Sequence, residues 1–283
     1  MRIANLSGRL VLLRGGGAVD VERASSGRFG ADPQAVYEYW EEFTAWAAGW
    51  AAGAAEDLEA EPYDVRDLGA PVPRPHQVLA IGLNYKDHTD ENDVAVPELP
   101  TVFTKSLSAL TGPQARVRLP EGDVDFEAEL VAVIGKKAWQ VEEADAWSYV
   151  AGLTIGQDLS ERVLQFTGPA PQWGPAKSHP GFAPLGPAVV TLDEFADPAD
   201  LEIGCSVNGE QMQKDRTSRM IHPIPAFLAW VTRIMTLLPG DIIFTGTPGG
   251  VGLARDPRRF LASGDELVTW VEGIGEIRQT FTG

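Results

Sequence analysis

The stretch DFEAEL, residues 125–130, places two carboxylates in a largely apolar run that continues as VAVIGKK. A strand directs alternate residues to one face, so Glu127 and Glu129 would point the same way, with Cα atoms roughly 6.6 Å apart. Two like charges among apolar neighbours have three resolutions: they face water, Arg or Lys bridges them, or they bind a cation. The spacing alone leaves all three open.

Of the three resolutions, binding of a cation is the one that would give this stretch a functional role. Asp158, in TIGQDLSER, follows a second apolar run and offers a third carboxylate. Three carboxylates without a Cys or His cluster suit Mg²⁺, Mn²⁺ or Ca²⁺ better than structural zinc. Glu127, Glu129 and Asp158 are therefore the candidate metal ligands.

A candidate general base occurs in GLNYKDHTDEN, residues 82–92, which follows the strand candidate VLAIGL. His88 and Glu91 are three residues apart, and are therefore neighbours on a helical turn. A carboxylate beside an imidazole fixes its tautomer and raises its basicity, which suits a base that deprotonates water. A surface ion pair is the alternative, and the spacing does not exclude it.

Two loops contain further polar groups. Lys177 lies in PAKSHPGF, residues 175–182, and either neutralises an enolate or carboxylate or is a surface lysine. The strand and glycine-rich loop DIIFTGTPGGVG, residues 241–252, contains Thr247 and backbone N–H groups that suit a carboxylate. This loop lacks the GxxxxGK[ST] pattern of a phosphate-binding P-loop.

The composition narrows the class of protein. The chain has 283 residues and a net charge of −17, which disfavours nucleic acid and anionic membranes as partners. Its one cysteine, Cys205, allows no intramolecular disulfide and fits a reducing compartment. No cleavable signal pattern is present, and no apolar run approaches the roughly 20 residues of a membrane span. We expect a cytoplasmic protein.

The elements that must position these residues divide the chain in two. Residues 1–70 predict a small α+β module, with a hairpin at a glycine turn and a helix whose buried face runs over residues 36–47. Residues 68–78 are proline-rich and predict a linker. Residues 71–283 predict a catalytic domain of mixed α/β, strand-rich class with helices at 142–150 and 223–238, and not a doubly wound sheet.

From about residue 76 to 281 the chain resembles the fumarylacetoacetate hydrolase family. The similarity is greatest to its small bacterial acylpyruvase and 2-hydroxyhepta-2,4-diene-1,7-dioate isomerase branch. Eight segments occur in the family's order: GLNYKDH, VFTK, DFEAELVAVIGK, AGLTIGQDLSER, the Lys177 loop, VNGE, LLPGDIIFTGTPGGVG and GDELVTWVEGIG. The resemblance implies a rolled mixed β-sheet catalytic domain, a smaller N-terminal module and a homodimer.

The resemblance also implies roles for the site residues. Mg²⁺ or Mn²⁺ would be held by the three candidate ligands, with Ca²⁺ able to bind in vitro and no organic cofactor. His88 and Glu91 would lie on a lid and activate water, and Lys177 would stabilise developing negative charge. Other residues would contact the substrate: Lys105, Arg162, Gln165 and Thr247.

The implied reaction is hydrolysis of a C–C bond in a 2,4-dioxo acid of the acylpyruvate type. The metal would bind the 2-oxo acid group and stabilise the departing enolate. Decarboxylation, isomerisation or hydration of a related 2-oxo acid, such as oxaloacetate, would use the same site. A catalytically altered member that binds a ligand without turnover is a third interpretation.

Two departures from the family pattern motivate that third interpretation. The chain has AKSHP where the family commonly has Gly-Lys-Ser-Phe-Asp, and Val163 where an Asp is common after Arg162. His179 is therefore a candidate substrate contact or proton carrier, with a solvent-facing loop histidine as the alternative. The departures bear on substrate identity more than on metal binding, because all three ligand positions match.

Overall fold

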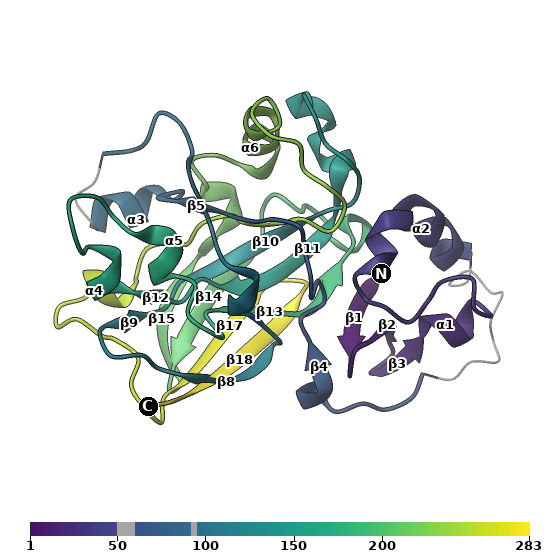
Figure 1. Cartoon of the computed structure of the whole chain (residues 1–283), viewed down its shortest axis with the longest axis horizontal. Helices are drawn as coiled ribbons and strands as arrows, with labels where there is room; N and C mark the ends of the chain where they lie inside the picture. The colour runs from purple at the N-terminus through teal and green to yellow at the C-terminus, as the bar shows by residue number, and fades with distance from the viewer. Residues whose placement is uncertain (50–59, 92–94) are drawn as a thin grey trace.

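The computed structural model describes residues 1–49, 60–91 and 95–283. Within these ranges, eleven strands form the larger sheet, in the order β3-β2-β1-β13-β11-β10-β16-β5-β6, with β4 beside β1 and β7 beside β13. Figure 1 shows this sheet extending from the N-terminal module into the larger body of the molecule. The strands are β1 Arg2–Leu6, β2 Arg9–Arg14, β3 Gly17–Asp20, β4 Leu68–Gly69, β5 Val78–Gly82, β6 Thr101–Thr104, β7 Leu110–Thr111, β10 Ala128–Ile134, β11 Val150–Gln157, β13 Ala183–Val190 and β16 Ile242–Phe244.

A second sheet packs against the first. It has the order β15-β14-β17-β18-β8, and its strands β14 and β17 contact β10 and β11 of the larger sheet. Its strands are β8 Gln114–Arg118, β14 Glu202–Val207, β15 Glu210–Arg216, β17 Glu266–Val271 and β18 Gly275–Thr282, and a separate pair consists of β9 Val124–Asp125 and β12 Ser160–Glu161. Both sheets combine parallel and antiparallel pairs, which confirms the predicted mixed, strand-rich class.

The helices are short and lie around these sheets (Figure 1). The α-helices are α1 Val21–Ala24, α2 Trp40–Gly49, α3 Lys86–Glu91, α4 Arg162–Gln165, α5 Trp173–Ala176 and α6 Ile224–Val231. The 3-10 helices are η1 Ala35–Tyr39, η3 Val65–Asp67, η4 Leu107–Ala109, η5 Glu143–Tyr149, η6 Leu192–Glu194, η7 Thr217–Arg219 and η8 Gly252–Ala254. No helix within the described ranges is long and apolar enough to span a membrane.

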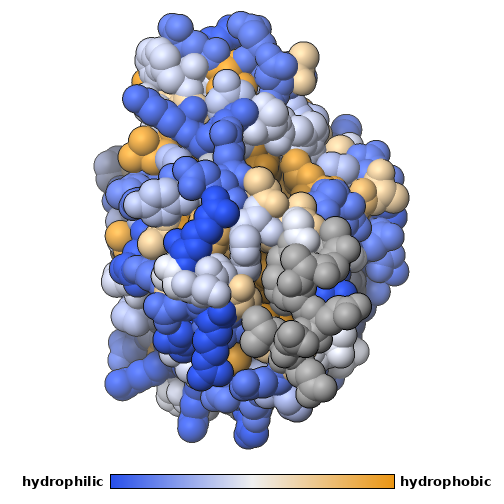
Figure 2. Space-filling view, turned by 90° about the vertical axis from the view of Figure 1, so that its right-hand side faces the viewer, coloured by the Kyte–Doolittle hydropathy of each residue, from blue (hydrophilic) through white to orange (hydrophobic). Residues whose placement is uncertain are grey.

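The N-terminal module joins the main sheet directly. Strand β1 pairs with β13 through Arg2↔Val190 and Ile3↔Val189, so residues 1–70 and the following part share one sheet. The proline-rich stretch 68–78 begins in β4 and ends in β5, and Val72 within it is fully buried. This stretch therefore packs into the core, and the division at residue 70 stays a prediction. Seen from the side of this module, hydrophilic residues cover most of the surface (Figure 2).

Three predicted helices differ in the structure. The predicted helix from residue 223 ends at Val231 and not at 238, because Leu237 pairs with Ala138 across an isolated bridge and the chain must leave the helix to reach it. The segment 142–150 forms a 3-10 helix. In the N-terminal helical segment Tyr39 is exposed although the predicted face included it, since the first turns are 3-10 and shift its direction.

The buried centre of the larger sheet requires glycine where its strands approach closely. A Cβ atom at Gly152 in β11 would lie 2.4 Å from the carbonyl oxygen of Val190 and 2.8 Å from Cγ1 of Val189. Both neighbours belong to the paired strand β13, so neither the backbone nor the packed side chain has room to move. The absence of a side chain at residue 152 therefore permits the contact of β11 with β13.

Replacement of Gly152 by Ala should lower the free energy of unfolding by about 1–3 kcal/mol, because the added methyl group overpacks a closed region. Urea unfolding of the Gly152→Ala variant measures this loss. Gly30→Ala is the matched control, since a Cβ at Gly30 meets no atom within 4 Å. Equal unfolding free energies for the two variants would contradict the close approach.

Candidate metal centre and active-site cavity

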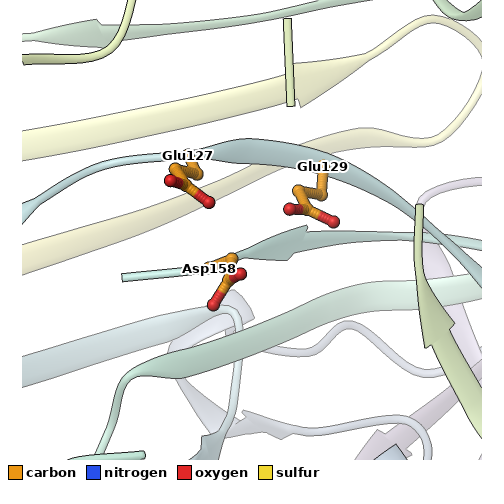
Figure 3. Close-up of side chains that lie close together, drawn as sticks. All are labelled: Glu127, Glu129 and Asp158. Carbon is orange, nitrogen blue, oxygen red and sulfur yellow. The ribbon is translucent and has the colours of Figure 1, made fainter. Parts of the chain in front are cut away.

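The three candidate metal ligands come together at neighbouring strands. Glu127 immediately precedes β10, Glu129 lies within it, and Asp158 immediately follows the paired strand β11. Figure 3 shows both glutamates projecting to the same side of one strand, with Asp158 close by on the next. All three are buried, and each offers an oxygen within 4.8 Å of the others. This burial excludes the water-facing interpretation of the glutamate pair.

Cationic side chains compensate part of this negative charge. Lys177 Nζ lies 2.6 Å from Glu127 Oε2 and 2.8 Å from Asp158 Oδ2, and Lys105 donates to the other oxygen of Asp158. Arg162 Nη2 lies 2.7 Å from Glu127 Oε1. Burial by itself would raise the pKa of the Glu127 carboxyl, but Lys177 and Arg162 outweigh it and hold that pKa below its ordinary value.

Glu129 is compensated less, because Lys177 opposes the rise of its pKa only weakly. Within the described ranges no cationic side chain lies in ion-pairing distance of its carboxylate, whose Oε2 accepts a hydrogen bond of 2.7 Å from the Gly246 N–H. Burial, and then the charges of Asp158 and Glu127, raise the pKa of Glu129 well above its ordinary value. A buried carboxylate beside two others, with no cation of its own, fits a divalent ion that takes oxygen ligands.

The predicted pair of His88 and Glu91 forms on helix α3. His88 Nδ1 lies 2.8 Å from Glu91 Oε1, and Glu91 Oε2 accepts a hydrogen bond of 2.6 Å from the Gly250 N–H. The glycine-rich loop thus uses its backbone N–H groups to hold carboxylates, as its composition suggested, but these are the side chains of Glu91 and Glu129. The loop fixes both the histidine's partner and one candidate metal ligand.

One cavity of about 490 Å³ is lined by both groups. The triad and the His88–Glu91 pair share it with Arg162, Gln165, Lys177 and Thr247. Aromatic side chains form part of its wall: Phe103, Phe166 and Trp173. Polar groups that converge in a cavity with apolar side chains in its wall are typical of a small-molecule site.

The remaining predicted residues lie apart from the lining of this cavity. Lys105 is buried behind it and contacts Asp158 and the carbonyl oxygen of Lys177. His179 packs on Phe182, with ring centroids 4.9 Å apart, and is not among the described lining residues. Val163 is 56% exposed on the outer side of α4. Substrate contact by His179 stays a prediction.

Two buried glutamines that the sequence did not point to hold the strand that carries the two glutamates of the triad. The Glu127 N–H donates to Gln157 Oε1 at 2.9 Å, and the next N–H, of Ala128, donates to Gln213 Oε1 at 2.9 Å. Gln213 also donates 2.7 Å hydrogen bonds to Thr247 Oγ1 and the Pro248 carbonyl oxygen. Gln213 therefore connects the metal-ligand strand to the glycine-rich loop.

Asp125 is a third residue whose role emerges only in the structure. It is fully buried and accepts hydrogen bonds from Arg162 Nε at 2.9 Å and from the N–H groups of Gly252 and Leu253 at 2.7 and 3.0 Å. It lies in the same DFEAEL stretch as the glutamates, and the sequence offers no sign that it binds a distant loop. Asp125 orients Arg162 toward Glu127.

Comparison with known proteins agrees with this geometry. Residues 77–282 match the fumarylacetoacetate (FAA) hydrolase C-terminal family. The chain is 40% identical over 265 residues, 93% of this chain and 83% of the relative, to the bovine (Bos taurus) mitochondrial oxaloacetate tautomerase FAHD2A.

Solved structures share the whole fold. An HpcE-like protein from Mycobacterium smegmatis is 50% identical with a TM-score of 0.94, over 100% of this chain and 99% of that one. Maleylpyruvate hydrolase from Sphingobium sp. SYK-6, solved with manganese(II) and pyruvate, is 29% identical with a TM-score of 0.81 over the full length of both chains. With its core fold, carboxylate triad and family match in agreement, this chain belongs to the fumarylacetoacetate hydrolase family.

Proposed function

We propose that this protein is a Mg²⁺- or Mn²⁺-dependent hydrolase that cleaves a C–C bond of a 2,4-dioxo acid of the acylpyruvate type. The observation that carries the proposal is the shared cavity, which has the carboxylate triad and the hydrogen-bonded His88–Glu91 pair in its walls. Hydrolysis needs both a cation site for the 2-oxo acid group and a base for water, and this cavity offers both. The hydrolase solved with manganese(II) and pyruvate supports this combination.

Glu127, Glu129 and Asp158 would hold the divalent ion. When bound, the ion supplies Lewis-acid stabilisation of negative charge on a 2-oxo acid. Lys177, whose pKa is held above its ordinary value by Asp158 and Glu127 against the opposing effect of burial, keeps its positive charge at the same place. It can therefore stabilise negative charge that develops on the departing group.

His88 and Glu91 would prepare the nucleophile. With its Nδ1 hydrogen-bonded to Glu91, the imidazole would take a proton from water at its second ring nitrogen, Nε2. The Gly250 N–H holds Glu91 from the opposite side, so the carboxylate keeps the ring in one orientation. The aromatic side chains in the wall would limit the access of bulk water to the same space.

Tautomerisation of oxaloacetate is the second candidate function. The bovine relative with this activity in its name is 40% identical over 93% of the chain. The reaction moves a proton within a 2-oxo acid and adds no water. It would use the same cation site. It should depend less on the His88–Glu91 pair, because no water has to be activated.

Glu129→Gln should weaken Mn²⁺ binding at least about tenfold, since even loss of an outer-shell partner costs that much. The metal-free variant should not be less stable than wild type, because the variant removes a buried acid whose charged form is disfavoured by burial and by the two neighbouring carboxylates. Calorimetric titration with Mn²⁺ and thermal unfolding measure the two effects. Glu143→Gln, at an exposed acid on η5, is the control; unchanged Mn²⁺ affinity in Glu129→Gln would refute the assigned ligand.

Glu91→Gln should reduce hydrolysis of acetylpyruvate about 100-fold or more, as expected for loss of general-base assistance. Oxaloacetate tautomerisation by the same variant should fall by a smaller factor. Steady-state assays with Mg²⁺ on both compounds, and on longer acylpyruvates, measure this difference. Asp90→Asn is the matched control on the same helix, since Asp90 is exposed and pairs with Lys86.

An equal loss of both activities would show that the pair does not act specifically on water. If the wild-type protein turns over oxaloacetate but no acylpyruvate, tautomerisation of oxaloacetate becomes the supported function and hydrolysis is refuted. Binding of Mn²⁺ without turnover of any 2-oxo acid would favour a non-catalytic family member.

A further inference from the structure

An arginine outside the metal centre lies in the wall of the active-site cavity. The segment RDPRR, residues 255–259, follows η8 and contains three arginines. Arg255 is held by the carbonyl oxygens of Gly250 and Met212, at 3.1 and 2.6 Å. Arg259 pairs with Asp265 at 2.8 Å. These two arginines attach the segment to the body of the protein.

Arg258, between them, has a different environment. It is exposed and lines the same cavity as the triad. Over the described parts of the chain, no carboxylate lies within ion-pairing distance of its guanidinium group. The other cations at this site, Arg162, Lys105 and Lys177, are all paired with buried carboxylates. Among the described arginines and lysines that line the cavity, Arg258 is therefore the one without a carboxylate partner.

The cavity has room for a ligand larger than the 2-oxo acid group alone. Leu253 and Ala254, which precede the arginine segment, also line the wall, so one stretch of chain runs along the cavity to Arg258. At about 490 Å³ the space falls in the range that holds ligands considerably larger than a three-carbon oxo acid. A substrate anchored at the triad can therefore extend toward Arg258.

The charge of the protein makes this cation consequential. With a net charge of −17, the protein repels a dianion more strongly than a monoanion. A guanidinium group offsets this repulsion locally, and its planar donors match a carboxylate in two parallel hydrogen bonds. We propose that Arg258 selects substrates that carry a second carboxylate at the end remote from the 2-oxo acid group. This inference rests on the proposed function, because it takes the 2-oxo acid end to be held at the triad.

The test uses matched pairs of unreactive 2-oxo acids that differ only in the remote carboxylate. The pairs are 2-oxoglutarate with 2-oxopentanoate, and 2-oxoadipate with 2-oxohexanoate. Calorimetric titration of the Mn²⁺-loaded protein gives the ratio of dissociation constants within each pair. Wild type should prefer the dicarboxylate in at least one pair.

Arg258→Gln should reduce this preference about tenfold. This factor is the lower end of the range expected for loss of a charge-assisted hydrogen bond, because the group is exposed. Its affinity for the monocarboxylates should stay close to wild type, and Arg258→Lys should be intermediate because an ammonium keeps the charge but not the paired donors. Arg233→Gln is the matched control, since Arg233 is also exposed and is not among the described residues that line the cavity.

Three results would overturn the inference. The first is that the wild-type protein binds these acids without preferring either dicarboxylate. This result would indicate that the aromatic wall of the cavity accommodates an uncharged acyl chain. The second is an Arg258→Gln variant that retains the full preference. In both cases the 2-oxo acids still bind, so the proposed function stands. The third is the absence of binding by all four acids, which would overturn the 2-oxo acid site together with the role of Arg258.

Discussion

Three carboxylates buried with oxygens within 4.8 Å of one another are the constraint on which the rest of the site depends. Two unit charges about 4 Å apart repel by about 4 kcal/mol at an effective dielectric constant of about 20, and burial adds a desolvation cost for each. Lys177, Arg162 and Lys105 offset most of this cost, and each comes from a different loop or helix. The electrostatics of the triad therefore tie together segments that the sheet alone does not join.

The buried cations do not compensate all of the negative charge of the buried carboxylates. With every group ionised, the four buried carboxylates of Asp125 and the triad face three buried cations, so the cluster has a formal excess of one negative charge. The deficit lies at Glu129, whose carboxylate has only the Gly246 N–H as a described hydrogen-bond partner. A site with balanced charge would gain little from a divalent ion, whereas this one has a specific reason to take one up.

The larger sheet supplies the rigidity that this arrangement needs. Strand β10 lies between β11 and β16, and its residues from 128 to 134 are all buried. At the N-terminal end of β10, side chains take the place of a paired strand as hydrogen-bond acceptors. Gln157 and Gln213 accept hydrogen bonds from the consecutive N–H groups of Glu127 and Ala128. Because both amides are buried and multiply bonded, the strand keeps its direction up to the first metal-ligand position.

Local patterns in the sequence were sufficient to predict several parts of the candidate site. The two-residue period of a strand places Glu127 and Glu129 on one face, and the helical period brings His88 next to Glu91, because both relations are set by backbone geometry over a few residues. The same reasoning failed for the helix predicted to run to residue 238, where pairing of Leu237 with Ala138 decides the end. The position of Asp158 after an apolar run made it a plausible third ligand, and the family resemblance then supported that assignment.

Only the tertiary structure decided which polar groups meet across long separations. No local pattern links Gln213 to Ala128, Asp125 to Gly252 or Arg258 to the cavity of the triad. The sequence by itself determined the strand-rich class, the ligand face of β10 and the His88–Glu91 pair. The compensation of charge, the anchoring of the ligand strand and the far end of the cavity depend on contacts between distant segments, and the free energy of such contacts exists only once the sheets have packed.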